Sequence, residues 1–271
     1  MSDHAAHVRA TMRPLPVADT GMVPKLPRFD GIRTVVFDLY GTLLVSDAGG
    51  GSHERERDPE GLPGFERVLQ ETVRAHQDRL RSQGAAHPEV EIRGVWAEAL
   101  AATGRPAKSR EEIETLVLRH ECGVNPVWPM PYAAEALAAL RGAGFVLGIV
   151  SNAQFYTLPV MEGLFGASLD GLGFHPGLRV FSFEEGEGKP SPRLFALLRE
   201  RAAALGIAPE EVFYLGNDLQ KDVLPAREAG FRTGLFAGDA RSLRLGGVSE
   251  QEATEIADAV ITGLDQVPGL F

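Results

Sequence analysis

The fold of this chain is decided by the stretch 34-TVVFDLYGTLL-44. An apolar, β-branched run ends there at the carboxylate of Asp38, and Gly41 and Thr42 follow in what reads as a turn. Such an uninterrupted apolar run predicts a strand buried on both faces of a parallel sheet. A carboxylate at the end of such a strand can act as a nucleophile, as a metal ligand, or as both. A strand followed by a plain polar turn fits the same letters, so the function depends on the rest of the chain.

Two later motifs place a hydroxyl and a lysine at comparable positions. The apolar run 146–150 ends at Ser151 and Asn152. Lys189 opens the stretch KPSP, whose serine suits a helix N-cap and whose last proline suits the first helical position. Lysine is scarce in this chain, where arginine supplies most of the positive charge, so a lysine inside a motif carries weight.

The fourth motif is rich in oxygen ligands. Asn217 and Asp218 follow the apolar run 212–215, and Asp222 lies one helical turn further on. Each of the four motifs has an ordinary structural explanation when taken alone. In this order they supply a nucleophile, a hydroxyl donor, a cation and an oxygen-rich metal cradle. Doubly wound α/β proteins place their sites at such strand ends.

The order of strands and helices predicts an α/β protein with a Rossmann-like parallel sheet and an inserted all-helical cap. We assign residues 31–46 and 125–271 to the core. Residues 47–124 read as a flexible, charged loop around Gly49–Gly51 followed by the helical cap. Residues 1–30 lack a clear period and read as a poorly ordered N-terminal arm. After the first strand, the core strands are expected at 146–150, 180–183, 212–215, 233–236 and 259–261, and helices at 157–164, 192–205 and 221–229.

Composition limits the partners. The net charge of −10 argues against nucleic acid or an anionic membrane surface as the main partner. A small anionic substrate is compatible with it, because local cations decide such binding. No apolar run reaches membrane-spanning length, and the seven histidines show no zinc-ligand spacing. The single cysteine, Cys122, fits a reducing compartment, and we expect a cytoplasmic protein; no pattern indicates an oligomeric state.

The four motifs together resemble the haloacid dehalogenase superfamily of aspartate-nucleophile hydrolases, over about residues 33–260. The resemblance implies an aspartyl-enzyme intermediate at Asp38, with Lys189 lowering the pKa of that carboxyl. Asp222 is expected to be a supporting or helix-start acid. The expected catalytic residues are Asp38, Tyr40, Ser151 and Lys189. The expected substrate-binding residues are Gly41, Thr42 and Asn152. The expected ligands of a Mg²⁺ ion are Asp38, the carbonyl of Tyr40, Asn217 and Asp218.

The motifs disagree on the reaction. Phosphatases of this superfamily carry an aspartate two residues after the nucleophile, where this chain has Tyr40, as the 2-haloacid dehalogenases do. Tyrosine, with a pKa near 10, is a poor proton donor to a leaving alcohol at neutral pH. The dehalogenases, however, have a serine-rich, metal-free segment where this chain has Gly216-Asn217-Asp218. We give this acid more weight and expect a Mg²⁺-dependent hydrolase of a small phosphorylated metabolite.

Two alternatives stay open. One is a metal-independent 2-haloacid dehalogenase, and the other is a catalytically weak member that binds a ligand or partner. Arg241 and Arg244 follow a further strand end; they could serve an anionic substrate, but we expect surface salt bridges there.

Overall fold

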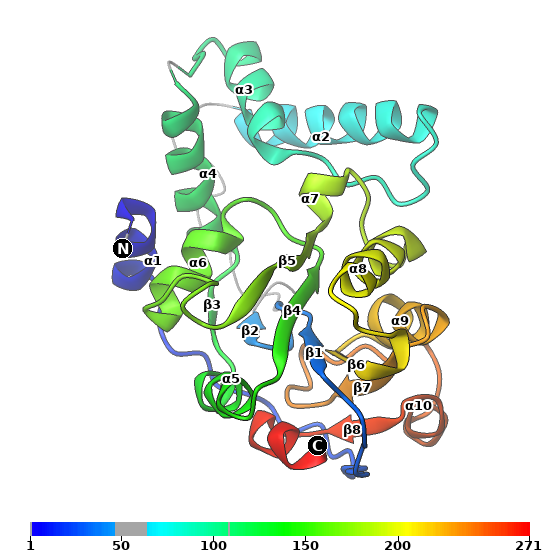
Figure 1. Cartoon of the computed structure of the whole chain (residues 1–271). Coiled ribbons are helices and arrows are strands. Elements are labelled where there is room, and N and C mark those ends of the chain that lie inside the picture. The colour runs from blue at the N-terminus through cyan, green and yellow to red at the C-terminus, as the bar shows by residue number, and fades with distance from the viewer. Residues whose placement is uncertain (1, 47–63, 108) are drawn as a thin grey trace.

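The computed structural model describes residues 2–46, 64–107 and 109–271 and contains a six-stranded parallel sheet (Figure 1). The strand order is β5-β4-β1-β6-β7-β8, which confirms the α/β class and the parallel core. The loop around Gly49–Gly51 lies outside the described residues. The strands are β1 (Thr34–Phe37), β4 (Val146–Ser151), β5 (Phe174–Phe181), β6 (Val212–Gly216), β7 (Arg232–Phe236) and β8 (Ala259–Ile261).

The central strand β1 has apolar side chains on both faces, so the sheet must be covered on both sides. Val35 and Phe37 pack into one apolar cluster, and Val36 packs into another on the opposite face. Each such fully buried side chain stabilises the fold by roughly 1.5–3 kcal/mol. Helices α5 (Ala133–Gly142) and α6 (Thr157–Phe165) lie on one side of the sheet, and α8 (Pro192–Ala204) and α9 (Leu224–Glu228) on the other (Figure 1). The carboxylate of Asp38 thus leaves a strand with no solvent-facing side.

Two elements differ from the expectation. β5 begins at Phe174 rather than at residue 180, although it contains a Pro-Gly pair. β5 is an edge strand of the sheet, and its pairing with β4 shifts register. Edge strands and register shifts are the places where a strand tolerates proline. The helix expected at 221–229 begins earlier, with a π-helical turn over Leu219–Val223, and continues as α9.

The regular elements in the described part of the insertion are helices joined by loops. Helices α2 (Phe65–Ser82), α3 (Ile92–Ala102) and α4 (Arg110–Val124) lie together above the carboxyl edge of the sheet (Figure 1). The rings of Phe65 and Trp96 join α2 to α3 with centroids 4.9 Å apart. The short strands β2 (Leu44–Ser46) and β3 (Val127–Pro129) pair antiparallel at the two ends of the insertion. Within the described ranges, no helix combines the length and the apolar character needed to cross a bilayer.

The N-terminal arm is not poorly ordered, which corrects the expectation. Helix α1 (Asp3–Thr11) packs against α6, with Ala5 and Val8 fully buried. The close approach needs Gly163, because a Cβ there would lie 2.5 Å from the carbonyl oxygen of Ala5. Further along, Lys25 forms a β-bridge with Val260 in β8. The buried positions of α1 span too few residues for a hydrophobic period to be recognised in the sequence.

Candidate active site

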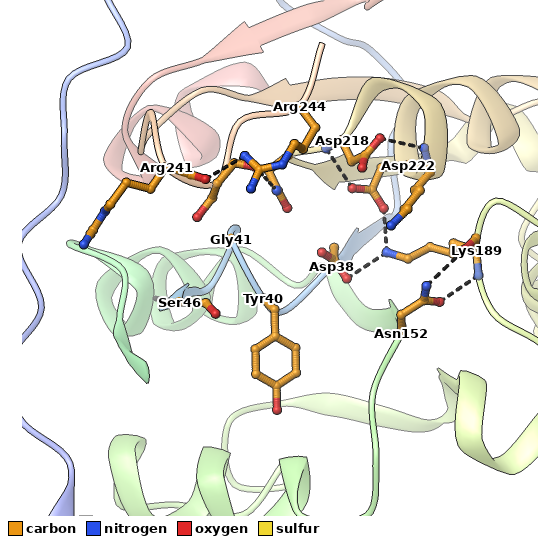
Figure 2. Close-up of a pocket in the computed structure, with 13 residues that line it drawn as sticks. Asp38, Tyr40, Gly41, Ser46, Asn152, Lys189, Asp218, Asp222, Arg241 and Arg244 are labelled. Carbon is orange, nitrogen blue, oxygen red and sulfur yellow. Dashed lines mark hydrogen bonds and ion pairs between the residues drawn. The ribbon is translucent and has the colours of Figure 1, made fainter. Parts of the chain in front are cut away.

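Strand ends from distant parts of the sequence meet at one edge of the sheet. Asp38 follows β1, Ser151 ends β4, and Asn217 follows β6. β1 pairs in parallel with both β4 and β6, so these three ends lie side by side. A cavity of about 290 Å³ opens there (Figure 2). It is lined by Asp38, Tyr40, Gly41, Ser46, Asn152, Lys189, Asn217, Asp218, Lys221, Asp222, Arg241, Ser242 and Arg244.

Asp38 and Asp222 share the ammonium of Lys189. Lys189 Nζ donates to Asp38 Oδ1 at 2.8 Å and to Asp222 Oδ1 at 2.5 Å. It also donates to the carbonyl of Val150 and to the hydroxyl of Tyr214. All three charged side chains are almost fully buried, so this cluster lies in a low-dielectric interior. The predicted pairing of Lys189 with Asp38 is present, and Asp222 is a second partner.

The pKa values follow from this burial. Burial raises the pKa of Asp38 to about 6, Asp222 adds to the rise, and Lys189 opposes it. The expected lowering by Lys189 is therefore real but smaller than the cost of desolvating the carboxylate. For Lys189, burial acts to lower the pKa, but Asp222 and Asp38 outweigh it and raise the pKa. Near neutral pH the lysine is charged and Asp38 is mostly ionised.

Ser151 is buried without a hydrogen-bond partner for its hydroxyl among the described residues. Its Oγ nevertheless lies near enough to Asp38 to help lower the pKa of that carboxyl. A buried hydroxyl without a partner is costly, so its presence beside Asp38 needs an explanation. The hydroxyl is thus available beside the predicted nucleophile.

The turn after Asp38 is packed against Asn217. Gly41 has a φ of 89°, and a Cβ there would lie 2.6–2.7 Å from the Asn217 amide. Thr42 Oγ1 donates to Asn217 Oδ1 at 3.2 Å, and Asn217 Nδ2 donates to the carbonyl of Ser242 at 2.7 Å. Gly41 lines the cavity as predicted, whereas Thr42 lies behind it. The structure therefore gives Thr42 a supporting contact with Asn217 rather than the predicted place in the substrate pocket.

Asn152 lines the cavity but its amide is already engaged. Its Oδ1 accepts from the Lys189 main-chain N–H at 2.7 Å, and its Nδ2 donates to the Lys189 carbonyl at 3.1 Å (Figure 2). Both ends of the amide thus hold the backbone of Lys189. The contacts give Asn152 a role in positioning that lysine, and its contact with substrate stays a prediction.

The acids after β6 have separate tasks. Asp218 Oδ1 accepts from the main-chain N–H groups of Gln220 and Lys221, both at 2.9 Å, and so begins the π-helical turn. Asp222 reaches back into the cluster, where its Oδ2 accepts from the Asp218 main-chain N–H at 3.0 Å. A Cβ on Gly216 would overlap the Asp222 carboxylate, so glycine is required there. Sequence reasoning underrated Asp222, because only the π-helical turn brings it to Lys189.

Tyr214 was missed. It lies in the middle of β6 and reads as a core residue, yet its hydroxyl donates to Asp222 Oδ1 at 2.9 Å. The same hydroxyl lies 3.2 Å from Lys189 Nζ, and the ring packs edge-on against Phe195. A polar aromatic residue inside an otherwise apolar strand was the available signal.

The side chain of Tyr40 points away from Asp38 (Figure 2). Its hydroxyl lies 2.9 Å from Thr157 Oγ1 at the start of α6. Burial raises the pKa of Tyr40 well above its usual value. The hydroxyl is thus neither placed nor poised to transfer a proton beside Asp38, although Tyr40 lines the cavity.

Comparison with known proteins agrees with this geometry. The family of haloacid dehalogenase-like hydrolases matches residues 32–230. A phosphoserine phosphatase of Thermus thermophilus is 41% identical over 142 residues, which are 51% of this chain and 51% of that protein. The chain therefore spans about half the length of that relative. A glyceraldehyde 3-phosphate phosphatase of Methanopyrus kandleri is 30% identical over 207 residues, 74% of this chain and 82% of that protein.

A solved structure shares the fold. The crystal structure of a dehalogenase with an intermediate complex superposes with a TM-score of 0.53 and 19% identity, over 90% of this chain and 98% of that one. At this identity the likeness concerns the fold alone. Together with the match over residues 32–230, the strand-end carboxylate and its lysine show that this chain belongs to the haloacid dehalogenase-like hydrolases.

Proposed function

We propose that this hydrolase cleaves a small phosphorylated metabolite through an aspartyl-enzyme intermediate and requires Mg²⁺. The observation that carries the proposal is a group of oxygen donors beside the buried lysine. Asp38, Asn217 and Asp218 line the same cavity as Lys189. The phosphatase relatives support the same reaction class. The helical insertion above the cavity is proposed to act as its cap.

The donor set suits a hard divalent cation. The carboxylates of Asp38 and Asp218, the Asn217 amide and the Tyr40 carbonyl are the proposed ligands. Asp38 and Asp222 share the single ammonium group of Lys189, which leaves one negative charge in excess in the cluster. This excess favours the binding of a cation beside Asp38. Among residues 2–46, 64–107 and 109–271, no three histidine, cysteine or acidic side chains form a metal cluster. Mg²⁺ commonly uses one or two carboxylates with neutral oxygens and water, and here it would neutralise charge on the phosphoryl oxygens.

The chain's own residues account for the covalent steps. A carboxylate oxygen of Asp38 attacks phosphorus, and the bond from phosphorus to the leaving oxygen breaks. Lys189 and the Ser151 hydroxyl stabilise the charge on the transferring group. Water then attacks the aspartyl phosphate, releases inorganic phosphate and restores the Asp38 carboxylate. Because the Tyr40 hydroxyl is turned away, the leaving alkoxide takes its proton from solvent, and esters with acidic leaving groups should react fastest.

Tyr40 favours a second candidate, 2-haloacid dehalogenation. A halide leaves without a proton, so that reaction needs no acid at this position. Asp38 would then form a carboxylate ester with the substrate carbon, and no metal would be required. The carboxylate of Asp218 beside Asn217 speaks against it, because it favours a bound cation that this reaction does not need.

A substrate panel with and without EDTA separates these candidates. We expect phosphate release that EDTA abolishes and Mg²⁺ restores, and no halide release from 2-chloropropionate. Asp38→Asn should lower turnover by about 10⁴-fold or more, because the amide cannot attack. EDTA-insensitive halide release would establish the dehalogenase instead. A weak binding member would show little turnover in either assay and unchanged ligand affinity in Asp38→Asn.

A further inference from the structure

We infer that Lys221 and Arg244 form a second anion site in the catalytic cavity, so that the preferred substrate is a compact phosphomonoester bearing a second anionic group. The inference rests on the proposed phosphatase function and names its substrate class. Both cations line the same cavity of about 290 Å³ as Asp38. A cavity of this size holds a short substrate whose two charged ends lie close together.

Arg244 is held beside the catalytic acids by its backbone. Its N–H donates to the Asn217 carbonyl at 3.0 Å, and its carbonyl accepts from the Leu219 N–H at 2.8 Å. Arg244 thereby forms a parallel bridge with Asp218, on the segment that also supplies the predicted metal ligands. Figure 2 shows its guanidinium directed toward the space above Gly41. The position of this arginine is therefore set by the same hydrogen bonds that set the active site.

Lys221 reaches the cavity from the π-helical turn. Asp218 caps that turn and accepts from the Lys221 main-chain N–H at 2.9 Å, which fixes the residue immediately before Asp222. The side chain is exposed and lines the cavity. Two cations thus approach one space from two different segments.

Four of the other five charged side chains of the cavity are engaged in ion pairs, and the fifth, Asp218, accepts from the main-chain N–H groups of Gln220 and Lys221. Asp38 and Asp222 are paired with Lys189, and Arg241 is paired with Asp239. In the described part of the chain, neither Lys221 nor Arg244 forms an ion pair with a carboxylate. The Arg244 guanidinium donates only to nearby carbonyls of its own loop, those of residues 241 and 243.

Of the two expected surface salt bridges, that of Arg241 is present, with Asp239, whereas Arg244 forms none with a described carboxylate. A protein with a net charge of −10 has many carboxylates that could pair with exposed cations, as Glu71 does with Arg67 on α2. Lys221 and Arg244 instead face the cavity without such partners among the described residues. An anionic group on the substrate is the partner that this arrangement suits, since guanidinium and ammonium groups bind carboxylate and phosphate strongly.

Two substrates of equal length test the inference. We compare kcat/KM of the Mg²⁺-supplied enzyme for 3-phosphoglycerate, which has a carboxylate, with that for glycerol 3-phosphate, which has a neutral hydroxymethyl group. We expect a preference of about tenfold or more for 3-phosphoglycerate, weakening as salt rises. Lys221→Gln and Arg244→Gln should each lower this ratio by about threefold, mainly through KM, and Arg244→Lys should restore part of it. Arg232→Gln, exposed at the opposite end of β7, should leave the ratio unchanged.

The outcomes separate this inference from the proposed function. If phosphomonoesters are hydrolysed with no preference for the second anion, the inference is wrong and the phosphatase function stands. An unchanged ratio in the Lys221→Gln/Arg244→Gln double variant has the same meaning, provided that its circular dichroism spectrum matches that of the wild type. If no phosphomonoester is hydrolysed at all, the proposed function fails and the inference fails with it.

Discussion

The cavity has an interior and a rim that use charge in opposite ways. In the interior, Lys189 lies between Asp38 and Asp222 and all three are nearly inaccessible to solvent. On the rim, Lys221 and Arg244 are exposed and pair with no described carboxylate. Buried charges are held in one arrangement because separating them is costly, whereas exposed charges are screened and free to meet an incoming ion. We therefore place the proposed chemistry in the interior and the proposed substrate selection on the rim.

Removing the interior cation should give the largest effect on the fold. Lys189→Met leaves two buried carboxylates without their shared partner, so we expect the free energy of unfolding near pH 8 to fall by about 3–5 kcal/mol. Turnover should be lost as well. Urea denaturation followed by circular dichroism measures the first effect. Adding Asp222→Asn should recover part of the stability but none of the activity. A Lys189→Met variant as stable as wild type would show that the interior is not a coupled cluster.

A smaller change inside the cluster tests the part played by Tyr214. Tyr214→Phe removes the hydroxyl that donates to Asp222 while keeping the ring against Phe195. We expect a loss of about 1–2 kcal/mol in the free energy of unfolding. Turnover should fall by about tenfold, because Lys189 loses a neighbour that helps to place it. The matched control is Tyr132→Phe, since Tyr132 is exposed and outside the cavity. Equal effects of the two substitutions would contradict the role of Tyr214.

The buried Asp38 carboxyl should also titrate unlike a solvated one. Burial, aided by Asp222 and opposed by Lys189, raises the pKa of Asp38 from 3.8 to about 6. In metal-free protein the Asp38 carboxyl carbon should therefore titrate near pH 6 in an NMR experiment, and this signal should be missing in Asp38→Asn. Because the folded pKa exceeds the unfolded one, the contribution of this group to stability is present below about pH 4 and is lost as pH rises through about 6. Mg²⁺ should move the midpoint to lower pH if Asp38 is a ligand. A midpoint near 4 in metal-free protein would mean that the carboxyl is solvated like that of an exposed aspartate.

Much of the molecule could be predicted because local signals agreed with the fold. Apolar runs that stop at polar residues marked β1, β4 and β6, and parallel pairing brings their ends together wherever they lie in the sequence. The pairing of Lys189 with Asp38 followed from the same reasoning. The start of β5 and the order of α1 were missed, because an edge strand tolerates a Pro-Gly pair and a short helix shows no readable period.

The sequence by itself determined the class of fold, the nucleophile candidate and the set of oxygen donors, because strand ends are marked by the chemistry of consecutive residues. Only the tertiary structure decided which donors are free and which are used. It turned the Tyr40 hydroxyl toward Thr157, engaged Asn152 with the Lys189 backbone and brought Asp222 to the lysine. It also left Lys221 and Arg244 facing the cavity. The physical reason is that hydrogen-bond partners and burial depend on contacts between residues far apart in the chain, and no local pattern encodes them.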